Sequence, residues 1–152
     1  MKKIILVLLL FLFNVSGVSA ATPVYKKTVE GTFEDAILEV RSALEQQHFF
    51  IVKELNIGNS LKRFSEDWGA DYNKNKLEGI YSFVFCHGWY ANLIGNADPD
   101  LLALCPLNVT LTHKLGVSTI VFVKPSAIAR DSHALPVAKK IEALLVQAME
   151  DL

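Results

Sequence analysis

The sequence predicts an α/β fold, an α+β sandwich in which helices pack on a mixed, largely antiparallel sheet. Three observations support this fold class. Apolar residues recur with helical spacing near both ends of the chain, short β-branched and aromatic runs lie between them, and two such runs flank a three-residue turn. The elements follow the order β-α-β-α-β-α-β-β-α, which is typical of helices packed on one sheet.

The first twenty residues have the pattern of an export signal. Two lysines precede an unbroken apolar run over residues 4–13, and a Val-Ser-Ala motif fits cleavage after Ala20. The apolar run is shorter than the ~20 residues that span a bilayer, which argues against a retained anchor. We therefore expect a periplasmic or secreted bacterial protein in which residues 21–152 form one domain that does not enter the membrane.

The charge of the mature domain argues against nucleic-acid binding. Of the 15 Lys and Arg residues two lie in the signal, which leaves 13 against 16 Asp and Glu, a net charge of −3. Binding to nucleic acid by charge needs a basic face that displaces counterions. The remaining basic residues are scattered along the sequence, so we expect neither a nucleic-acid partner nor a polybasic membrane patch.

The first half of the domain alternates strands and helices. Residues 24–30 predict a strand that ends at Gly31. Thr32-Phe-Glu-Asp35 has the form of a capping box, and apolar residues at spacings of 4, 3 and 4 predict a helix over 32–47. The next expected elements are a strand over 49–57, a short helix over 61–68 and a polar loop over 71–79.

The second half is expected to end in a hairpin and a helix. Asp98 before Pro99 suits an N-cap followed by the first helical position. Two apolar runs joined by Lys-Leu-Gly116 predict an antiparallel hairpin, and Ser132 or Asp131 is expected to cap the last helix. The elements are a strand over 80–85, helical segments over 90–94 and 99–104, and strands over 107–113 and 117–123. The buried face of the last helix is expected to hold Val137, Ile141, Leu144, Leu145, Ala148 and Leu152.

Short motifs in a fixed order along residues 25–150 carry a family resemblance. They are Gly31–Ile37, Val40–Leu44, Leu61-Lys62, Gly69–Asp71, Phe85-Cys86, Ala97–Pro99 and Leu104–Val109. Together they resemble the bacterial family catalogued as domain of unknown function 302. The resemblance implies a small α/β sandwich, often a homodimer, and brings with it no established reaction.

Two places depart from the pattern that the resemblance implies. His48 stands where a glycine is expected, so the turn after the first helix is reshaped. The sequence His87-Gly88-Trp89-Tyr90 replaces an Asn-Pro type sequence after the first cysteine. A ligand preference of that loop in the family therefore does not carry over to this chain.

The two cysteines are the first candidate functional residues. Cys86 ends a strand-like run and Cys105 ends a helix-like run. An even pair in an exported protein favours a disulfide, which would close about 20 residues and stabilise the fold by roughly 3 kcal/mol. Two unbridged packing thiols and a ligand-binding or redox-active pair are the alternatives. The spacing is not Cys-x-x-Cys, so a thioredoxin-like motif is absent.

Histidines near the cysteines raise the question of a metal or haem. His87 follows Cys86, and His113 lies on the predicted strand after Cys105. Cys and His ligands on neighbouring strands suit a soft metal or a haem. However, the chain has no HExxH, no Cys-x-x-Cys-His and no paired-cysteine zinc spacing. We expect no cofactor, with a haem or metal at His87 or His113 as the lesser alternative.

These observations predict a small exported binding or accessory protein, rather than an enzyme, that forms a homodimer and binds a small molecule. The ligand site is expected where element ends converge. Its residues are Cys86, His87, Gly88, Trp89, Cys105 and Asn108. Two alternatives stay open: a thiol-dependent redox or sulfur-transfer enzyme that uses Cys86 or Cys105, and a structural module whose aromatic surface docks another protein. No catalytic residue is assigned.

Overall fold

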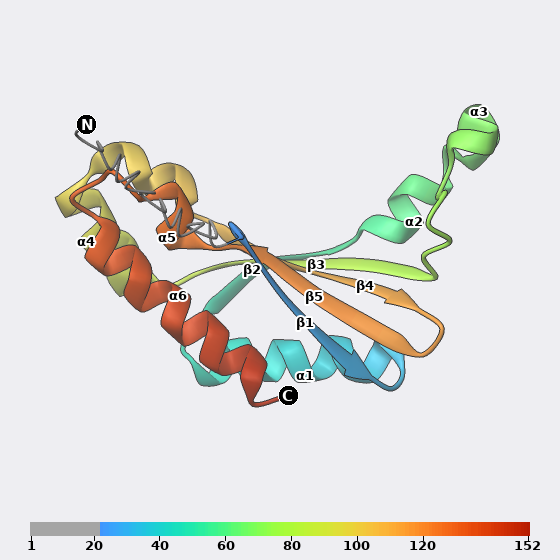
Figure 1. Ribbon diagram of the computed structural model, residues 1–152, viewed down its shortest axis with the longest axis horizontal. Helices are drawn as coiled ribbons and strands as arrows, with labels where there is room; N and C mark the ends of the chain where they lie inside the picture. Colours follow the sequence, from blue (N-terminus) through green and yellow to red (C-terminus); the bar gives the residue numbers. More distant parts are fainter. Residues whose placement is uncertain (1–21) are drawn as a thin grey trace, which may run out of the picture.

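Residues 22–152 of the computed structural model form a five-stranded sheet with helices packed against it (Figure 1). The predicted export signal lies outside these residues. Within residues 22–152, no helix has both the length and the apolar character that crossing a membrane requires.

The elements follow one another in the order expected from the sequence, with one short helix added near the end. The strands are β1 (Val24–Glu30), β2 (Phe50–Asn56), β3 (Gly79–Cys86), β4 (Leu107–Lys114) and β5 (Val117–Val123). The α-helices are α1 (Phe33–Gln46), α2 (Ile57–Lys62), α3 (Ser65–Trp68), α4 (Gly88–Ala97), α5 (Pro125–Ile128) and α6 (Leu135–Glu150). Two 3₁₀ helices complete the fold, η1 (Gly69–Asp71) and η2 (Pro99–Leu104).

The sheet is antiparallel at every pairing, in the order β1-β5-β4-β3-β2. The sequence left a mixed sheet open, and the structure resolves this in favour of antiparallel strands. The predicted hairpin is confirmed, since β4 and β5 pair up to Lys114 and Val117 across a two-residue turn. Leu115 and Gly116 both take positive φ, 50° and 75°, as the favoured two-residue hairpin turn requires.

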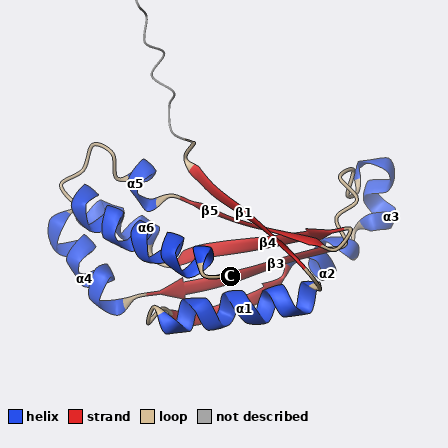
Figure 2. Cartoon of the chain, turned by 60° about the horizontal axis from the view of Figure 1, so that its bottom comes forward, coloured by secondary structure: helices blue, strands red, loops and turns tan. Residues whose placement is uncertain are grey.

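One face of the sheet carries the core. Alternate residues of the central strands point toward the helices and are fully buried, among them Phe83, Phe85 and Leu111. Figure 2 shows α1 and α6 side by side on this face. They contribute buried Leu44 and Leu145 to the same core. The predicted α+β sandwich is therefore confirmed, with α1 and α6 on one side of the sheet.

The predicted capping box at the start of α1 is present in a modified form. The Thr32 hydroxyl oxygen accepts the backbone N–H of Asp35 at 3.1 Å, as expected of an N-cap. The Asp35 carboxylate does not reach back to the Thr32 backbone. It accepts the Thr32 hydroxyl proton instead, at 2.7 Å. Both groups at the helix start are thereby satisfied.

The prediction of one short helix over 61–68 is wrong in two respects: the helix begins earlier, and it is interrupted. α2 begins four residues earlier, because the Asn56 side chain accepts the backbone N–H of Asn59 at 2.9 Å and caps the helix there. A break at Arg63-Phe64 then separates α2 from α3. An asparagine at the end of an apolar strand was the signal for this cap.

The predicted cap of the last helix is also corrected. α6 begins at Leu135, and the residue in the N-cap position, Ala134, makes no side-chain cap. Ser132 stabilises the preceding turn instead, where its hydroxyl accepts the Ala134 N–H at 3.0 Å. The same hydroxyl donates to Asp98 at 2.5 Å, which fastens this turn to the start of η2. Asp98 also caps η2 as predicted, accepting the Asp100 N–H at 3.2 Å.

The turn that ends α1 gives a first prediction. His48 has a φ of 59°, in the left-handed region that glycine adopts without strain and other residues enter at a cost of about 1 kcal/mol. We expect His48→Gly to raise the free energy of unfolding by about 0.5–1 kcal/mol in urea denaturation, because the exposed imidazole makes no compensating hydrogen bond. His48→Ala, which keeps the strain, is the control and should bring no such gain. A loss of stability in His48→Gly would contradict this explanation.

Candidate functional site

The two cysteines lie next to each other at one end of the sheet. Cys86 is the last residue of β3, and Cys105 follows η2 and directly precedes β4. Their Sγ atoms are 3.2 Å apart, and both residues are half-buried free thiols. The segment between them contains α4 and η2. The structure therefore brings together two side chains that the sequence placed at separate element ends.

The Cys105 thiol is held in its protonated form. Burial raises the pKa of Cys105 to about 11, and the hydrogen bond and charge interaction with Cys86 add to this effect. A thiol reacts as its thiolate, so a raised pKa slows attack by Cys105 at neutral pH. This argues against Cys105 as an activated nucleophile.

The other predicted ligand residues do not all join the cysteines. The His87 ring packs edge-on against Phe49 and Tyr90, with ring centroids 5.7 and 4.7 Å away. Trp89 is 63% exposed. Gly88 is also exposed, and the exposed Asn108 pairs with Val84 rather than with the end of β3. Cys86, His87 and Cys105 gather at the start of α4, whereas Gly88 and Trp89 are exposed there and Asn108 lies further along the sheet.

The space beside these residues is nearly filled. An apolar gap between α4, η2 and α6 is lined by His87 and Cys105 together with Ile94, Leu101 and Ile141. Its volume is about 10 Å³. A cavity of this size holds about one water molecule. A larger ligand would have to displace core side chains there.

His113 belongs to a row of three polar side chains. Its Nδ1 lies 2.8 Å from the Ser118 hydroxyl, and its Nε2 lies 4.0 Å from the Glu78 carboxylate. These are the residue types of a nucleophilic triad, yet Ser118 is only 1% exposed and faces the core. No group of three or more metal-ligating side chains is found in the part of the chain that the structure describes. The row links β4, β5 and the loop before β3.

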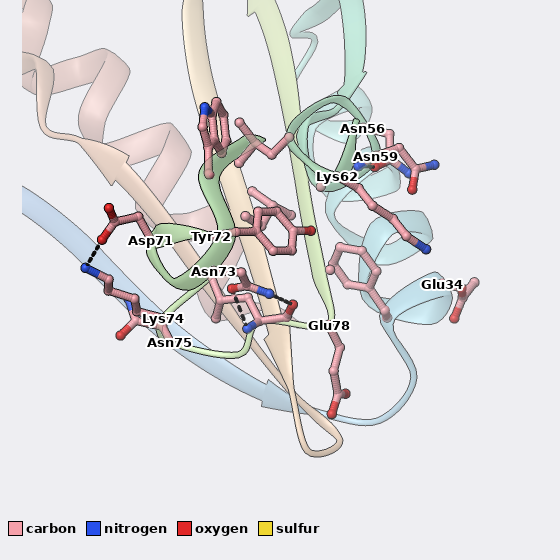
Figure 3. A pocket seen from close by; sticks show the side chains of 17 residues that line it. Glu34, Asn56, Asn59, Lys62, Asp71, Tyr72, Asn73, Lys74, Asn75 and Glu78 are labelled. Carbon is pink, nitrogen blue, oxygen red and sulfur yellow. Dashed lines mark hydrogen bonds and ion pairs between the residues drawn. The ribbon is translucent and has the colours of Figure 1, made fainter. Parts of the chain in front are cut away.

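A second cavity lies at the other end of β3 and was not predicted. It is a groove of about 570 Å³ lined by four segments: the start of α1, helix α2, the stretch from Trp68 to Glu78, and the start of β3 (Figure 3). We refer to it as the α2–β3 groove. No single stretch of sequence signals it, because its walls are up to 47 positions apart and include a loop that reads only as polar.

Aromatic and aliphatic side chains form much of the groove wall. Phe33, Trp68 and Tyr72 line it together with Leu61 and Ile80. Figure 3 shows the Tyr72 ring turned into the cavity from the loop side, across from Lys62 of α2. Such walls offer flat apolar surfaces to a ligand.

Gly79 fixes the position of one wall. A Cβ atom at Gly79 would lie 2.2 Å from the Phe33 ring, well inside any permitted contact. The absence of a side chain at the first residue of β3 therefore allows the Phe33 ring to pack directly on the strand. This close approach closes the inner end of the groove.

The polar groups of the groove fall into two sets. Some shape the walls: the Asn73 side chain accepts the Leu77 N–H at 2.9 Å and donates to the Leu77 carbonyl at 2.8 Å. Others are free to meet a ligand. Within residues 22–152, the side chains of Asn59 and Lys62 and the Tyr72 hydroxyl have no hydrogen-bond or ion-pair partner.

Comparison with known proteins identifies the family. Residues 25–152 match the family described as domain of unknown function DUF302. The chain belongs to this family. The fold of this DUF302 protein is similar to the crystal structure of an uncharacterized conserved DUF302 protein from Bacillus stearothermophilus, with a TM-score of 0.72 and 18% sequence identity. That match covers 86% of this chain and 98% of the other. No curated protein matches.

The family resemblance expected from the sequence motifs is thereby confirmed. At 18% identity the Bacillus stearothermophilus structure supports the fold alone. It assigns neither a ligand nor a reaction to this DUF302 protein. The site has to be argued from this chain's own residues.

A third polar constellation, on the helix-covered face, is structural. The Glu54 carboxylate of β2 accepts from the Arg41 guanidinium at 2.6 Å and from the Tyr81 hydroxyl at 2.7 Å. Partial burial by itself would raise the pKa of Glu54, but the two hydrogen bonds and the Arg41 charge outweigh it and lower that pKa. The carboxylate is thus ionised and saturated at neutral pH, which suits a brace between α1, β2 and β3 rather than a general base.

This brace gives a prediction for pH-dependent stability. Because the pKa of Glu54 is lower in the folded state than its usual 4.5, its contribution is present above the unfolded-state pKa and is lost as pH falls through the folded-state value. We expect Glu54→Gln to cost on the order of 1 kcal/mol at pH 7 and progressively less in acid, measured by urea unfolding across pH. Glu39→Gln, at an exposed position of α1, is the control. An equal cost of Glu54→Gln at all pH values would contradict the assignment.

Proposed function

We propose that this DUF302 protein is an exported small-molecule-binding protein and that its ligand occupies the α2–β3 groove. The observation that carries the proposal is the groove itself, whose volume of about 570 Å³ lies in the usual range for ligand pockets. Aromatic walls and a few unpaired polar groups are the lining that such pockets use. The gap beside His87 and Cys105 has space for about one water molecule, so the groove is the better-supported position.

The lining favours a neutral ligand with a flat ring. Charges of both signs line the groove, among them Lys62, Glu34 and Glu78, while Asp71 and Lys74 pair with each other and point away from the cavity (Figure 3). Neither an anion nor a cation is therefore selected. Stacking surfaces at Tyr72 and Phe33, and free donors and acceptors at the rim, suit a ring with an apolar face and a hydrogen-bonding edge.

Binding can be tested with defined probes. A panel of monosaccharides and neutral heteroaromatic rings is added to ¹⁵N-labelled protein, and the shifts of backbone amides are followed. We expect saturable shifts at the groove amides of Gly58, Asn59 and residues 77–80. Shifts confined to the region of Cys86, or no saturable shift with any probe at millimolar concentration, would overturn the proposed site.

A matched pair of variants then tests the stacking wall. The chain has two tryptophans, so Trp89→Phe leaves Trp68 as the one fluorescent reporter in the groove. In that background we expect Tyr72→Ala to weaken binding of the best probe at least tenfold, or about 1.4 kcal/mol. Phe50→Ala removes an exposed aromatic ring at the opposite end of β2 and should leave the affinity unchanged. Equal effects of the two changes would contradict a specific role for Tyr72.

We also propose that two copies of the chain pair through the sheet face that lacks α1 and α6. By strand alternation, the middle parts of the three central strands present uncharged side chains there. These are Ile80, Ser82, Val84, Asn108, Thr110, Thr112, Thr119 and Val121. Charged residues stand only around this area: Lys26, Glu30, Lys53 and Lys114. Phe50, 73% exposed, borders it. An uncharged centre with a margin of both charge signs fits a self-complementary twofold interface.

The dimer is tested by light scattering across protein concentrations. Thr119→Lys places an additional charge on β5 within the proposed interface, and we expect it to raise the dimer dissociation constant at least tenfold. Lys140→Thr, on the exposed side of α6, is the control and should dimerise as the parent does. A parent protein that stays monomeric at high concentration would refute the pairing.

A further inference from the structure

We propose that Cys86 and Cys105 form an intrachain disulfide in the exported protein, acquired by exchange with a disulfide-bearing oxidant. The proposal does not depend on the ligand of the α2–β3 groove. The observation that carries it is the placement of two thiols, both half-buried, with their Sγ atoms 3.2 Å apart. A disulfide has a sulfur separation of ~2.05 Å, so small side-chain rotations bring the two atoms to bonding distance.

Backbone hydrogen bonds hold both cysteines where the bond would form. Cys86 pairs with Phe50 in the β2–β3 ladder. The Cys105 N–H donates to the Leu102 carbonyl at 2.8 Å, which closes the last turn of η2. The backbone at both positions is held by hydrogen bonds, so the fold itself keeps the two sulfurs close together. Because the two sulfurs are already close together within one chain, an intrachain bond is favoured over a link to a second chain.

The exchange proceeds in two balanced steps. The Cys86 thiolate attacks one sulfur of the oxidant, a new bond forms between that sulfur and Cys86 Sγ, and the oxidant's S–S bond breaks to release a thiolate. Cys105 then gives its proton to solvent, and its sulfur attacks Cys86 Sγ and expels the second oxidant sulfur. The two cysteines lose two electrons and two protons, and the oxidant is reduced to two thiols.

Cys86 is assigned the first step because of the state of its neighbour. Burial raises the pKa of Cys105 to about 11, so Cys105 persists as a thiol at neutral pH. A persistent thiol attacks an external disulfide slowly, but Cys105 can lose its proton and resolve a mixed disulfide on Cys86 because the two Sγ atoms are only 3.2 Å apart. The bond formed would close a loop that contains all of α4 and η2.

The test uses the mature chain purified in reduced form and treated with oxidised glutathione. After acid quenching and alkylation, mass spectrometry should find the wild-type chain lighter by two hydrogen atoms, with no alkyl group and no glutathione. Cys105→Ser should stop after the first step and carry one glutathione on Cys86. Wild-type chains that keep two alkylatable thiols, retain glutathione or link to a second chain would overturn the proposal.

A stability measurement on the wild-type protein tests the proposal without relying on the Cys105→Ser variant. If Cys105→Ser does not fold, the wild-type protein alone still decides the outcome, since its oxidised and reduced forms are compared directly. We expect the oxidised form to shift the unfolding equilibrium toward the folded state by at least about tenfold relative to the reduced form. Identical unfolding curves for the two forms would show that no bridge constrains the α4–η2 segment.

Discussion

Burial of a single face of the antiparallel sheet determines where every other part of this molecule lies. Phe83 and Phe85 of β3 are fully buried under the helices, and Leu44 of α1 packs on the same face. Each such side chain contributes roughly 1.5–3 kcal/mol through removal of apolar surface from water. The helices are therefore committed to that face. The rest of the chain can form sites only at the two ends of the strands or on the uncovered face.

Strand β3 connects the two sites that result. Gly79 and Ile80 at its start line the α2–β3 groove, and Cys86 at its end meets Cys105. Seven residue steps from Gly79 to Cys86 separate the two positions by about 23 Å. A small ligand in the groove cannot touch the thiols across that distance. The groove and the cysteine pair are thus chemically independent features of one strand, and each can be altered without changing the other's side chains.

The sequence was sufficient for most of the fold because regular burial leaves regular patterns. Helix α1 and the β4–β5 hairpin followed from apolar spacing and a glycine turn, and the structure confirms both. The bounds or existence of short helices were not predicted correctly, because a few polar contacts determine where such helices form. The Asn56 cap moved the start of α2, and the one-turn helix α5 begins at a proline in a stretch with no periodicity.

The candidate site was harder to predict than the fold. The two cysteines could be proposed as partners, since they stand at the ends of neighbouring elements, and the structure places them together. The groove could not, because Phe33, Asn59 and Tyr72 come from three segments whose proximity depends on tertiary packing. Its polar loop carried a sequence signal only for turns. Nothing in the sequence around Gly79 indicates that the Phe33 ring packs against it.

The groove has the properties of a preformed pocket rather than of a flexible loop. The Asn73 side chain closes its own loop with two hydrogen bonds to Leu77. The Glu78 N–H donates to the His113 carbonyl at 2.8 Å, and the Glu78 carboxylate accepts the Leu115 N–H at 3.2 Å. The loop wall is therefore fastened to the tip of the β4–β5 hairpin, which in turn belongs to the buried sheet. A ligand that enters would pay little to order these walls, so even a few stacking and hydrogen-bond contacts can yield measurable affinity.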